Sequence, residues 1–173
     1  VEQYETARVF RSVRGAANGY APLSLNRLKN LMLYMLENIS EVWCTKMNKL
    51  LFYVDFLAYR ENGMAISGLS YKAIDFGPVP DRWDVVYSEF DEIHQELKSA
   101  GDFVGSVLTS PTPSDTTLFS EPELKVMRQV CSRFNSLSSR ELSRLSHEEN
   151  AWINHHVCHE NIPFVDAFDL KAL

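Results

Sequence analysis

The stretch "TKMNKLLFYVDFLAYRE", residues 45–61, carries two apolar patterns at once. The first recurs every three to four residues, which predicts a helix with one apolar stripe. Its members are Met47, Leu50, Leu51, Val54, Leu57 and Ala58. The second pattern is aromatic and consists of Phe52, Tyr53, Phe56 and Tyr59. These rings cannot all lie on that stripe, so at least one of them must face a second surface, which is either another packed element or a protein interface.

The neighbouring segments on both sides also have recognisable patterns. Gly63 is expected to end the helix predicted over residues 45–61. Upstream, Ser24 is a suitable N-cap for a helix whose apolar residues recur at helical spacing over residues 25–39, and we expect the two helices to pack as an antiparallel pair. Downstream, "MAISGLSYKAIDF", residues 64–76, mixes β-branched and aromatic residues around a Ser-Gly break. This predicts a short hairpin or two small strands.

The segment "FGPVP", residues 76–80, restricts its backbone strongly. Gly77 permits unusual backbone angles, whereas Pro78 and Pro80 fix their own φ. We expect a rigid corner that leads into a helix, with Pro80 in the first turn of that helix. The inward stripe expected for it contains Trp83, Val86, Tyr87, Phe90, Ile93 and Leu97.

The remainder of the chain predicts one strand and then more helices. Residues 102–109 read as a strand and residues 110–117 as an exposed loop. Three capping-box patterns, each a Ser followed three residues later by Glu, predict three helix starts. They are Ser120 with Glu123, Ser138 with Glu141, and Ser146 with Glu149. The expected fold is α+β, a predominantly α-helical single domain with a small antiparallel β-hairpin or sheet.

Composition and charge narrow the class of protein. The chain has 173 residues and a net charge of -6. The first 60 residues hold eight Lys and Arg against five Asp and Glu, whereas residues 61–173 hold nine against eighteen. Such an acidic surface repels a phosphate backbone and attracts a basic protein. There is no apolar run long enough to span a membrane, and the three cysteines share no paired spacing, so we expect a cytoplasmic protein with no membrane partner.

Sequence signatures of catalysis and of cofactor binding are missing. The chain has no glycine-rich phosphate loop, no G-x-S-x-G turn and no Cys-x-x-Cys pair, so we expect neither catalytic residues nor a cofactor. The cluster His155, His156, Cys158 and His159 has good zinc-ligand types but lacks a second ligand pair. We therefore prefer a solvated helix end there over a zinc site or a metal-dependent hydrolase, and expect no metal.

One set of polar residues within the apolar segments could also be catalytic. Asp55 lies between Val54 and Phe56 in an apolar helix, and a carboxylate in such a place has to be paired or hydrogen-bonded. Asp55, Asp75 and Tyr71 could form a catalytic set. We favour instead a buried structural hydrogen bond from Asp55 to a backbone group or a tyrosine.

The order of these features resembles a known family. The run at residues 45–90, with its K-L-L-F-Y-x-D-F helix, its I-S-G hairpin and its aromatic-G-P-V-P corner, is followed by "LSSRELSRLSHEENAW", residues 137–152. This arrangement resembles the Panacea domain of SocA-like antitoxins over about residues 23–153. The resemblance implies a domain at residues 23–173, preceded at residues 1–22 by an N-terminal helix or linker that would join it to an upstream DNA-binding module.

The resemblance also implies a function without catalysis. The expected activity is that of an antitoxin that neutralises a cognate protein toxin by direct binding. Two alternatives stay open: a DNA-binding autoregulator of the toxin-antitoxin operon, or an adaptor that delivers the toxin to a protease. Operator DNA would be a partner only through the upstream module, and a homodimer is left open.

Two groups of residues carry these expectations. The first comprises aromatics and the rigid corner, because rigid aromatic surfaces bind partners at low ordering cost. The expected toxin-binding residues are Tyr53, Phe56, Tyr71, Phe76, Pro78, Val79 and Pro80. The residues expected to support the motif structurally are Asp55, Gly68, Gly77, Trp83, Ser146, His147 and Trp152.

Overall fold

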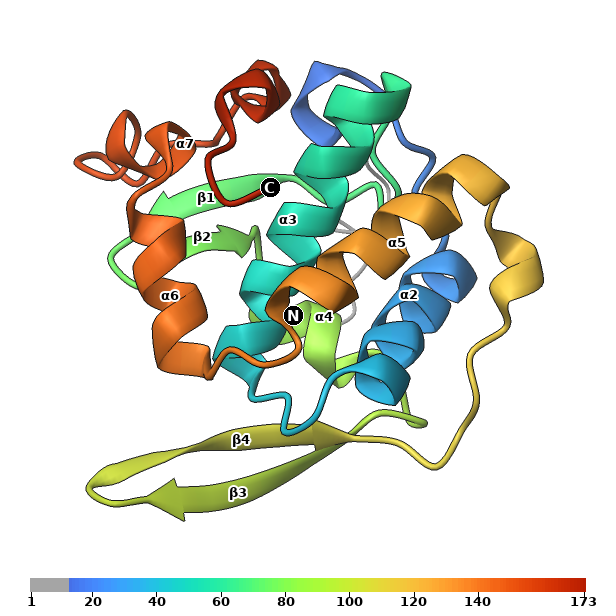
Figure 1. Ribbon diagram of the computed structural model, residues 1–173, viewed down its shortest axis with the longest axis vertical. Coiled ribbons are helices and arrows are strands. Elements are labelled where there is room, and N and C mark those ends of the chain that lie inside the picture. The colour runs from blue at the N-terminus through green and yellow to red at the C-terminus, as the bar shows by residue number, and fades with distance from the viewer. Residues whose placement is uncertain (1–12) are drawn as a thin grey trace.

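A computed structural model describes residues 13–173 and shows a mostly helical α+β domain with two small antiparallel sheets (Figure 1). The expected fold class is confirmed. The α-helices are α2 (Leu25–Asn38), α3 (Cys44–Asn62), α4 (Trp83–Ser88), α5 (Glu121–Phe134), α6 (Ser139–His147) and α7 (Asn150–Ile153). The strands are β1 (Tyr71–Ile74), β2 (Gly77–Pro80), β3 (His94–Ala100) and β4 (Phe103–Thr109). Three short 3-10 helices complete the list: η1 (Ala16–Asn18), η2 (Thr116–Leu118) and η3 (Phe164–Asp169).

Of the N-terminal helix or linker expected at residues 1–22, residues 1–12 lie outside the described residues. Within residues 13–173, no helix combines the length and the apolar composition that crossing a bilayer would need.

The helix α3 forms the centre of the domain. Figure 1 shows it crossing the middle of the molecule, with α5 and α2 on one side and α6 and the β1–β2 pair on the other. Every residue from Lys46 to Ala58 is buried. Phe56 stacks on Phe164 of η3 with ring centroids 4.4 Å apart, and Tyr53 lies 4.7 Å from Phe134 of α5. The second surface expected for these aromatics is therefore made of packed elements, which surround α3 on all sides.

Strands β1 and β2 form a hairpin whose two-residue turn is Asp75–Phe76. We expected Gly77–Pro80 to be a corner leading into a helix, and this was wrong, because the segment is the strand β2 and pairs with β1 along its whole length. A pair of prolines in four residues argues locally against a strand. The pairing with β1 overrides that local signal.

The hairpin accommodates both prolines because neither position needs an N–H group toward β1. Pro78 and Pro80 lie opposite Ala73 and Tyr71. The backbone groups of these β1 residues point toward residues 160–162 instead, where Ala73 N donates at 3.0 Å and Tyr71 O accepts at 2.8 Å. Hydrogen-bonded and non-hydrogen-bonded pairs alternate along an antiparallel ladder. The prolines therefore remove no hydrogen bond between the two strands.

The helix expected to run from Trp83 to Leu97 is much shorter. It ends at Ser88, and Leu97 lies on β3 with 79% of its surface exposed. Trp83, expected on the inward stripe, is 40% exposed, whereas Val86 and Tyr87 are buried as expected. The expectation failed because β3 is held by pairing with β4, which is not visible in the local periodicity.

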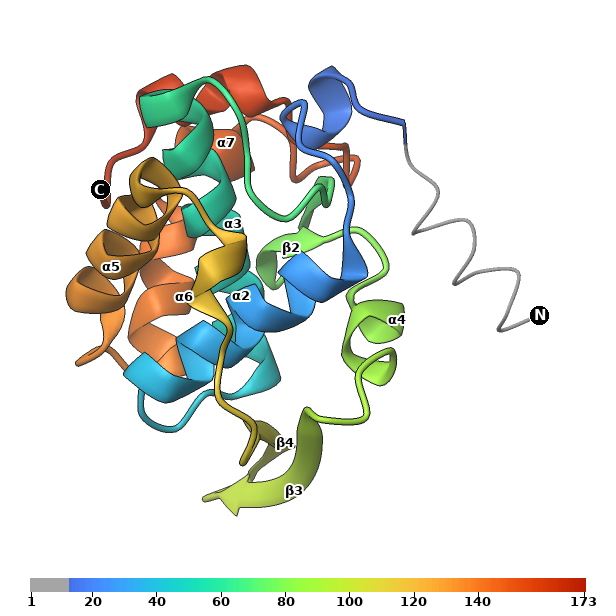
Figure 2. The ribbon, with the colours of Figure 1, turned by 90° about the vertical axis from the view of Figure 1, so that its right-hand side faces the viewer.

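The β3–β4 hairpin extends from the helical body as an arm (Figures 1 and 2). The expected strand at residues 102–109 is confirmed as β4. At its base, Leu108 N donates to Val42 O at 2.8 Å, and Trp43 bridges to Val107. Trp43 also lies 5.7 Å from the Phe103 ring. These contacts attach β4 to the loop between α2 and α3, and β3 reaches the body chiefly through β4.

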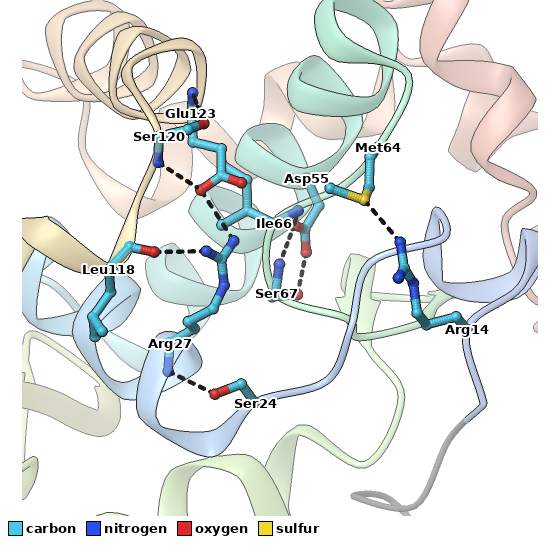
Figure 3. Close-up of polar contacts among 10 residues, drawn as sticks. All are labelled: Arg14, Ser24, Arg27, Asp55, Met64, Ile66, Ser67, Leu118, Ser120 and Glu123. Carbon is cyan, nitrogen blue, oxygen red and sulfur yellow. Dashed lines mark hydrogen bonds and ion pairs between the residues drawn. The ribbon is translucent and has the colours of Figure 1, made fainter.

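Of the helix starts predicted from capping residues, those at Ser24, Ser120 and Ser138 are confirmed, and the one at Ser146 is wrong. Ser24 accepts from Arg27 N, and the capping box at Ser120 is formed (Figure 3). The capping box at Ser138 is formed as well. The third box was wrong. Ser146 lies inside α6, where its hydroxyl donates to Ser143 O at 2.7 Å, and α7 begins after Glu149.

Candidate partner-binding surface

A buried carboxylate joins α3 to the segment before β1. Asp55 is fully buried and accepts hydrogen bonds from Ile66 N and Ser67 N, each at 2.8 Å (Figure 3). It also accepts from Tyr71 OH at 2.5 Å. The Ser67 hydroxyl donates to it as well. Burial raises the pKa of this carboxyl, and the four donors oppose the shift. The structure thus contains the buried hydrogen bonds that we favoured over a catalytic set, and Asp75 lies apart from them on the hairpin turn.

Three distant segments meet where Gly77 begins β2. Gly77 has φ +99, and a Cβ atom there would lie 2.9 Å from both Lys49 Cε and Ser146 Oγ. Only glycine fits such an angle and such a close approach. Lys49 Nζ donates to Pro78 O at 3.1 Å. Lys49 of α3 and Ser146 of α6 therefore pack against the first residues of β2 and hold them in place.

The turn itself is fixed through its carbonyl groups. Trp152 Nε1 donates to Ile74 O at 2.7 Å, and His147 Nε2 lies 3.0 Å from Asp75 O. His159 Nε2 lies 2.9 Å from the Asp75 carboxylate. Side chains from α6, α7 and the segment that follows thus anchor two consecutive residues of the hairpin. The result is a turn with little freedom to rearrange.

Phe76 is the apolar residue of this fixed turn, and like its neighbour Asp75 it is exposed. It is 75% exposed, whereas Tyr53, Phe56 and Tyr71 have no exposed surface. The other expected toxin-binding residues, Pro78, Val79 and Pro80, are buried as well. The structure places five of the seven expected residues on the β1–β2 hairpin and brings Phe56 against Tyr71, with ring centroids 5.8 Å apart, whereas Tyr53 packs against Phe134 of α5. In the folded domain Phe76 is the one of the seven that offers most of its side chain to a partner.

The residues expected to support the family motif structurally make different kinds of contact. Gly68 has φ +80, and a Cβ atom there would lie 2.8 Å from the Leu23 backbone. Trp83 and Tyr87 have ring centroids 6.0 Å apart on α4. Together with Trp83, residues that include Ile74 and Val79 line a pocket of about 160 Å³ on the outer face of the β1–β2 hairpin.

The histidine cluster does not converge on one point. His155 lies between two carboxylates, with Nδ1 3.2 Å from Glu160 and Nε2 2.9 Å from Asp166. His156 stacks on Trp152 with centroids 4.1 Å apart, and Cys158 is exposed. Among residues 13–173, no group of three or more His, Cys, Asp and Glu side chains is placed to hold a metal ion.

Comparison with known proteins gives one match. The family described as antitoxin SocA-like, Panacea domain, matches residues 47–153. The chain belongs to this family. No curated protein and no solved structure matches the chain.

The part of this Panacea domain that matches the family contains the place where α3, α6 and the start of β2 meet. It begins within α3, ends with α7, and includes the β1–β2 hairpin and the β3–β4 arm. Lys49, Gly77 and Ser146 come from three separate motif segments of the sequence and meet at one place. The G-P-V-P motif is thus explained first by packing, and the exposed Phe76 precedes it on the turn.

The roles of two buried residues of the Panacea domain were missed by the sequence analysis. Lys49 is 1% exposed, and its position within an apolar helix was the available signal. Glu149 is also 1% exposed, and although it is the N-cap residue of α7, its side chain makes no capping hydrogen bond. Its carboxylate accepts from Tyr53 OH at 3.1 Å, Lys171 N at 2.9 Å and Ala172 N at 3.0 Å. Glu149 thereby fixes residues 171–172 against α3, a contact too distant in sequence to predict.

We predict that Lys49 makes the domain more stable at pH 9 than at pH 7. Burial lowers the pKa of the Lys49 ammonium from 10.5 to about 7. Between these values the unfolded chain holds a proton at this site and the folded chain does not, so the free energy of unfolding rises with pH, by about 2 kcal/mol from pH 7 to pH 9.

Urea unfolding of the wild type and of Lys49→Met at both pH values measures this effect. Other titrating groups contribute equally to the two proteins, so the rise appears as a difference between them. Stability curves that run parallel for the wild type and the variant contradict the prediction.

Proposed function

We propose that this SocA-like domain is an antitoxin that neutralises a cognate protein toxin by direct contact, with Phe76 as a central anchor of the interface. The observation that carries the proposal is the exposure of Phe76, which is 75%, on a turn whose neighbouring carbonyl groups are held by Trp152 and His147. Membership of the antitoxin family supports a protein toxin as the partner.

Preorganisation of the turn supports a binding role. Immobilising a flexible segment on association consumes binding energy, and the β1–β2 turn is already fixed before a partner arrives. Aromatic side chains in rigid settings are common binding anchors, because they bury a large area with few rotatable bonds. Asp75 and His159, which lie beside Phe76 in an ion-pair contact, supply a polar rim.

The test takes the product of the adjacent reading frame as the candidate toxin and measures complex formation by isothermal titration calorimetry. We expect a stoichiometric complex with the wild type. The Phe76→Ala variant should bind at least about tenfold more weakly, because an interface anchor contributes about 2 kcal/mol or more. The Phe168→Ala variant is the matched control, since Phe168 is an aromatic residue on η3 with 61% exposure.

Three outcomes contradict the proposal. One is neutralisation of the toxin with no detectable complex. Another is equal affinity of the wild type and Phe76→Ala for the toxin. The third is specific binding of operator DNA by this chain in the absence of toxin binding, which would favour the autoregulator alternative.

A further inference from the structure

The outer edge of β3 is a long, exposed strand edge. All seven residues of β3 are exposed, and Figure 1 shows β4 lying between β3 and the helical body. The pairing with β4 is continuous from His94 to Ala100, and β3 contains no proline. Strand edges of this kind are usually shortened, interrupted or covered, because their free N–H and C=O groups pair with other strands. The edge of β3 is neither shortened, interrupted nor covered, and its one protection is the charge of Glu96 and Lys98, which disfavours strands without matching charges.

The register determines which backbone groups of β3 face outward. Ala100 and Phe103 flank a two-residue loop and form the first hydrogen-bonded pair with each other, and such pairs alternate along the ladder. Leu108 N donates away from β3, to Val42 O at 2.8 Å, which agrees with this alternation. Every second residue of β3 therefore directs its N–H and C=O to the free edge. These residues are Gln95, Leu97 and Ser99.

The charge pattern of β3 is complementary to that of a second β3 strand that runs antiparallel to it. In an antiparallel pair centred on Leu97, Glu96 of one strand lies opposite Lys98 of the other, and the same contact recurs on the opposite side of the centre. Leu97 then lies opposite its own counterpart, and Gln95 lies opposite Ser99. The outward-facing residues pair only with outward-facing residues in this register, so their main-chain hydrogen bonds can form.

We propose that β3 pairs with β3 of a second copy of this chain, antiparallel and centred on Leu97, to give a four-stranded sheet across the dimer. A two-fold axis through the Leu97 pair makes the contact isologous and closed, as in most homodimers. Each of the three outward-facing pairs exchanges two main-chain hydrogen bonds. The Glu96 and Lys98 side chains form cross-strand ion pairs on one face of the sheet.

The other face of the sheet gains apolar contacts. Leu97 is 79% exposed in the single chain and packs against its counterpart in the dimer. Val104 is 63% exposed and lies on the same face of the arm, one diagonal step from Leu97. Burial of these side chains adds to the hydrogen bonds and ion pairs.

The order of the charged residues, Glu96 before Lys98, favours a second copy of this chain over an unrelated strand as the partner that pairs with the β3 edge. A strand from another protein would need an acidic and a basic residue in the reverse order at the same spacing, whereas the same chain carries both. This inference is independent of toxin binding, because Phe76 lies on the other hairpin.

The experiment measures self-association of the full chain by sedimentation equilibrium at low ionic strength and several concentrations. The wild type should show a monomer–dimer equilibrium. Glu96→Lys and Lys98→Glu each place like charges opposite each other twice per dimer, so each should raise the dissociation constant of the dimer at least about tenfold. The double variant restores opposite charges at both positions and should return to within about threefold of the wild type.

A mixture of the two single variants gives a second test of the register. One variant is basic and the other acidic at both positions, so they should form a 1:1 heterodimer although neither forms a homodimer. Lys125→Glu on α5 is the control, because it makes the same change in net charge as Lys98→Glu at an exposed site away from the arm. Circular dichroism of each variant checks that it is folded.

The results that overturn the inference are equally specific. They are a wild type that stays monomeric at all concentrations, a dimer that is indifferent to both single reversals, or a double variant that associates no better than the single variants.

Discussion

The Gly77→Ala variant is expected to lose about 3 kcal/mol of unfolding free energy. Gly77 has φ +99, a backbone angle that costs an alanine about 1–2 kcal/mol. The added methyl group would also lie 2.9 Å from both Lys49 Cε and Ser146 Oγ, and forcing an atom into a packed core costs a further 1–3 kcal/mol or so. Urea unfolding at neutral pH measures the loss.

Gly63→Ala is the matched control for this variant. Gly63 has φ +76 at the end of α3, but no atom lies within 4 Å of the position that its Cβ would take. The backbone cost remains and the steric cost is removed, so we expect a loss of about 1 kcal/mol. Equal losses for the two variants would show that the close approach of Lys49 and Ser146 to Gly77 has no energetic weight.

Removal of the Asp55 carboxylate is expected to cost about 4 kcal/mol. Asp55→Ala leaves four buried donors without an acceptor: Ile66 N, Ser67 N, the Ser67 hydroxyl and the Tyr71 hydroxyl. Each unsatisfied buried donor costs about 1–3 kcal/mol, and partial rearrangement around the vacated site offsets part of the sum. Denaturant unfolding at neutral pH measures the change.

Tyr71→Phe is the control for the carboxylate. It removes one donor and leaves the acceptor with the three others, so we expect a loss of about 1 kcal/mol. Should Asp55→Ala cost no more than Tyr71→Phe, the carboxylate would not be what holds residues 66–71 to α3.

These expectations change the meaning of the G-P-V-P motif. Pro78, Val79 and Pro80 are buried, and Gly77 lies against Lys49 and Ser146, so the motif holds a hairpin in place. The neighbouring Phe76 is the large apolar side chain that this arrangement leaves in solvent. A rigid structural element and the proposed binding surface are thus two consecutive parts of one hairpin.

The helices could be predicted well where a local signal sets them. The helix α3 follows the apolar spacing from Met47 onward and ends at Gly63, which has φ +76. The caps at Ser24, Ser120 and Ser138 fix three helix starts through contacts within three residues. Such contacts are decided by neighbouring residues alone, so the sequence order is sufficient to read them.

Prediction failed where a distant segment competes with the local pattern. The apolar spacing after Trp83 fits a helix, yet residues 94–100 pair with β4. Ser146 and Glu149 have the spacing of a capping box, but Glu149 instead accepts from the backbone of residues 171–172. Both outcomes depend on residues that are not neighbours in the sequence.

By itself, the sequence determined the helical class of the domain, the central aromatic helix, the need of Asp55 for buried partners and the resemblance to SocA-like antitoxins. Only the tertiary structure decided which aromatics are buried, that Phe76 is exposed, and that β3 presents a free edge. The physical reason is that helix periodicity and capping act over three or four residues. Burial and strand pairing depend on which distant segments come together, and the order of residues within one segment does not specify that.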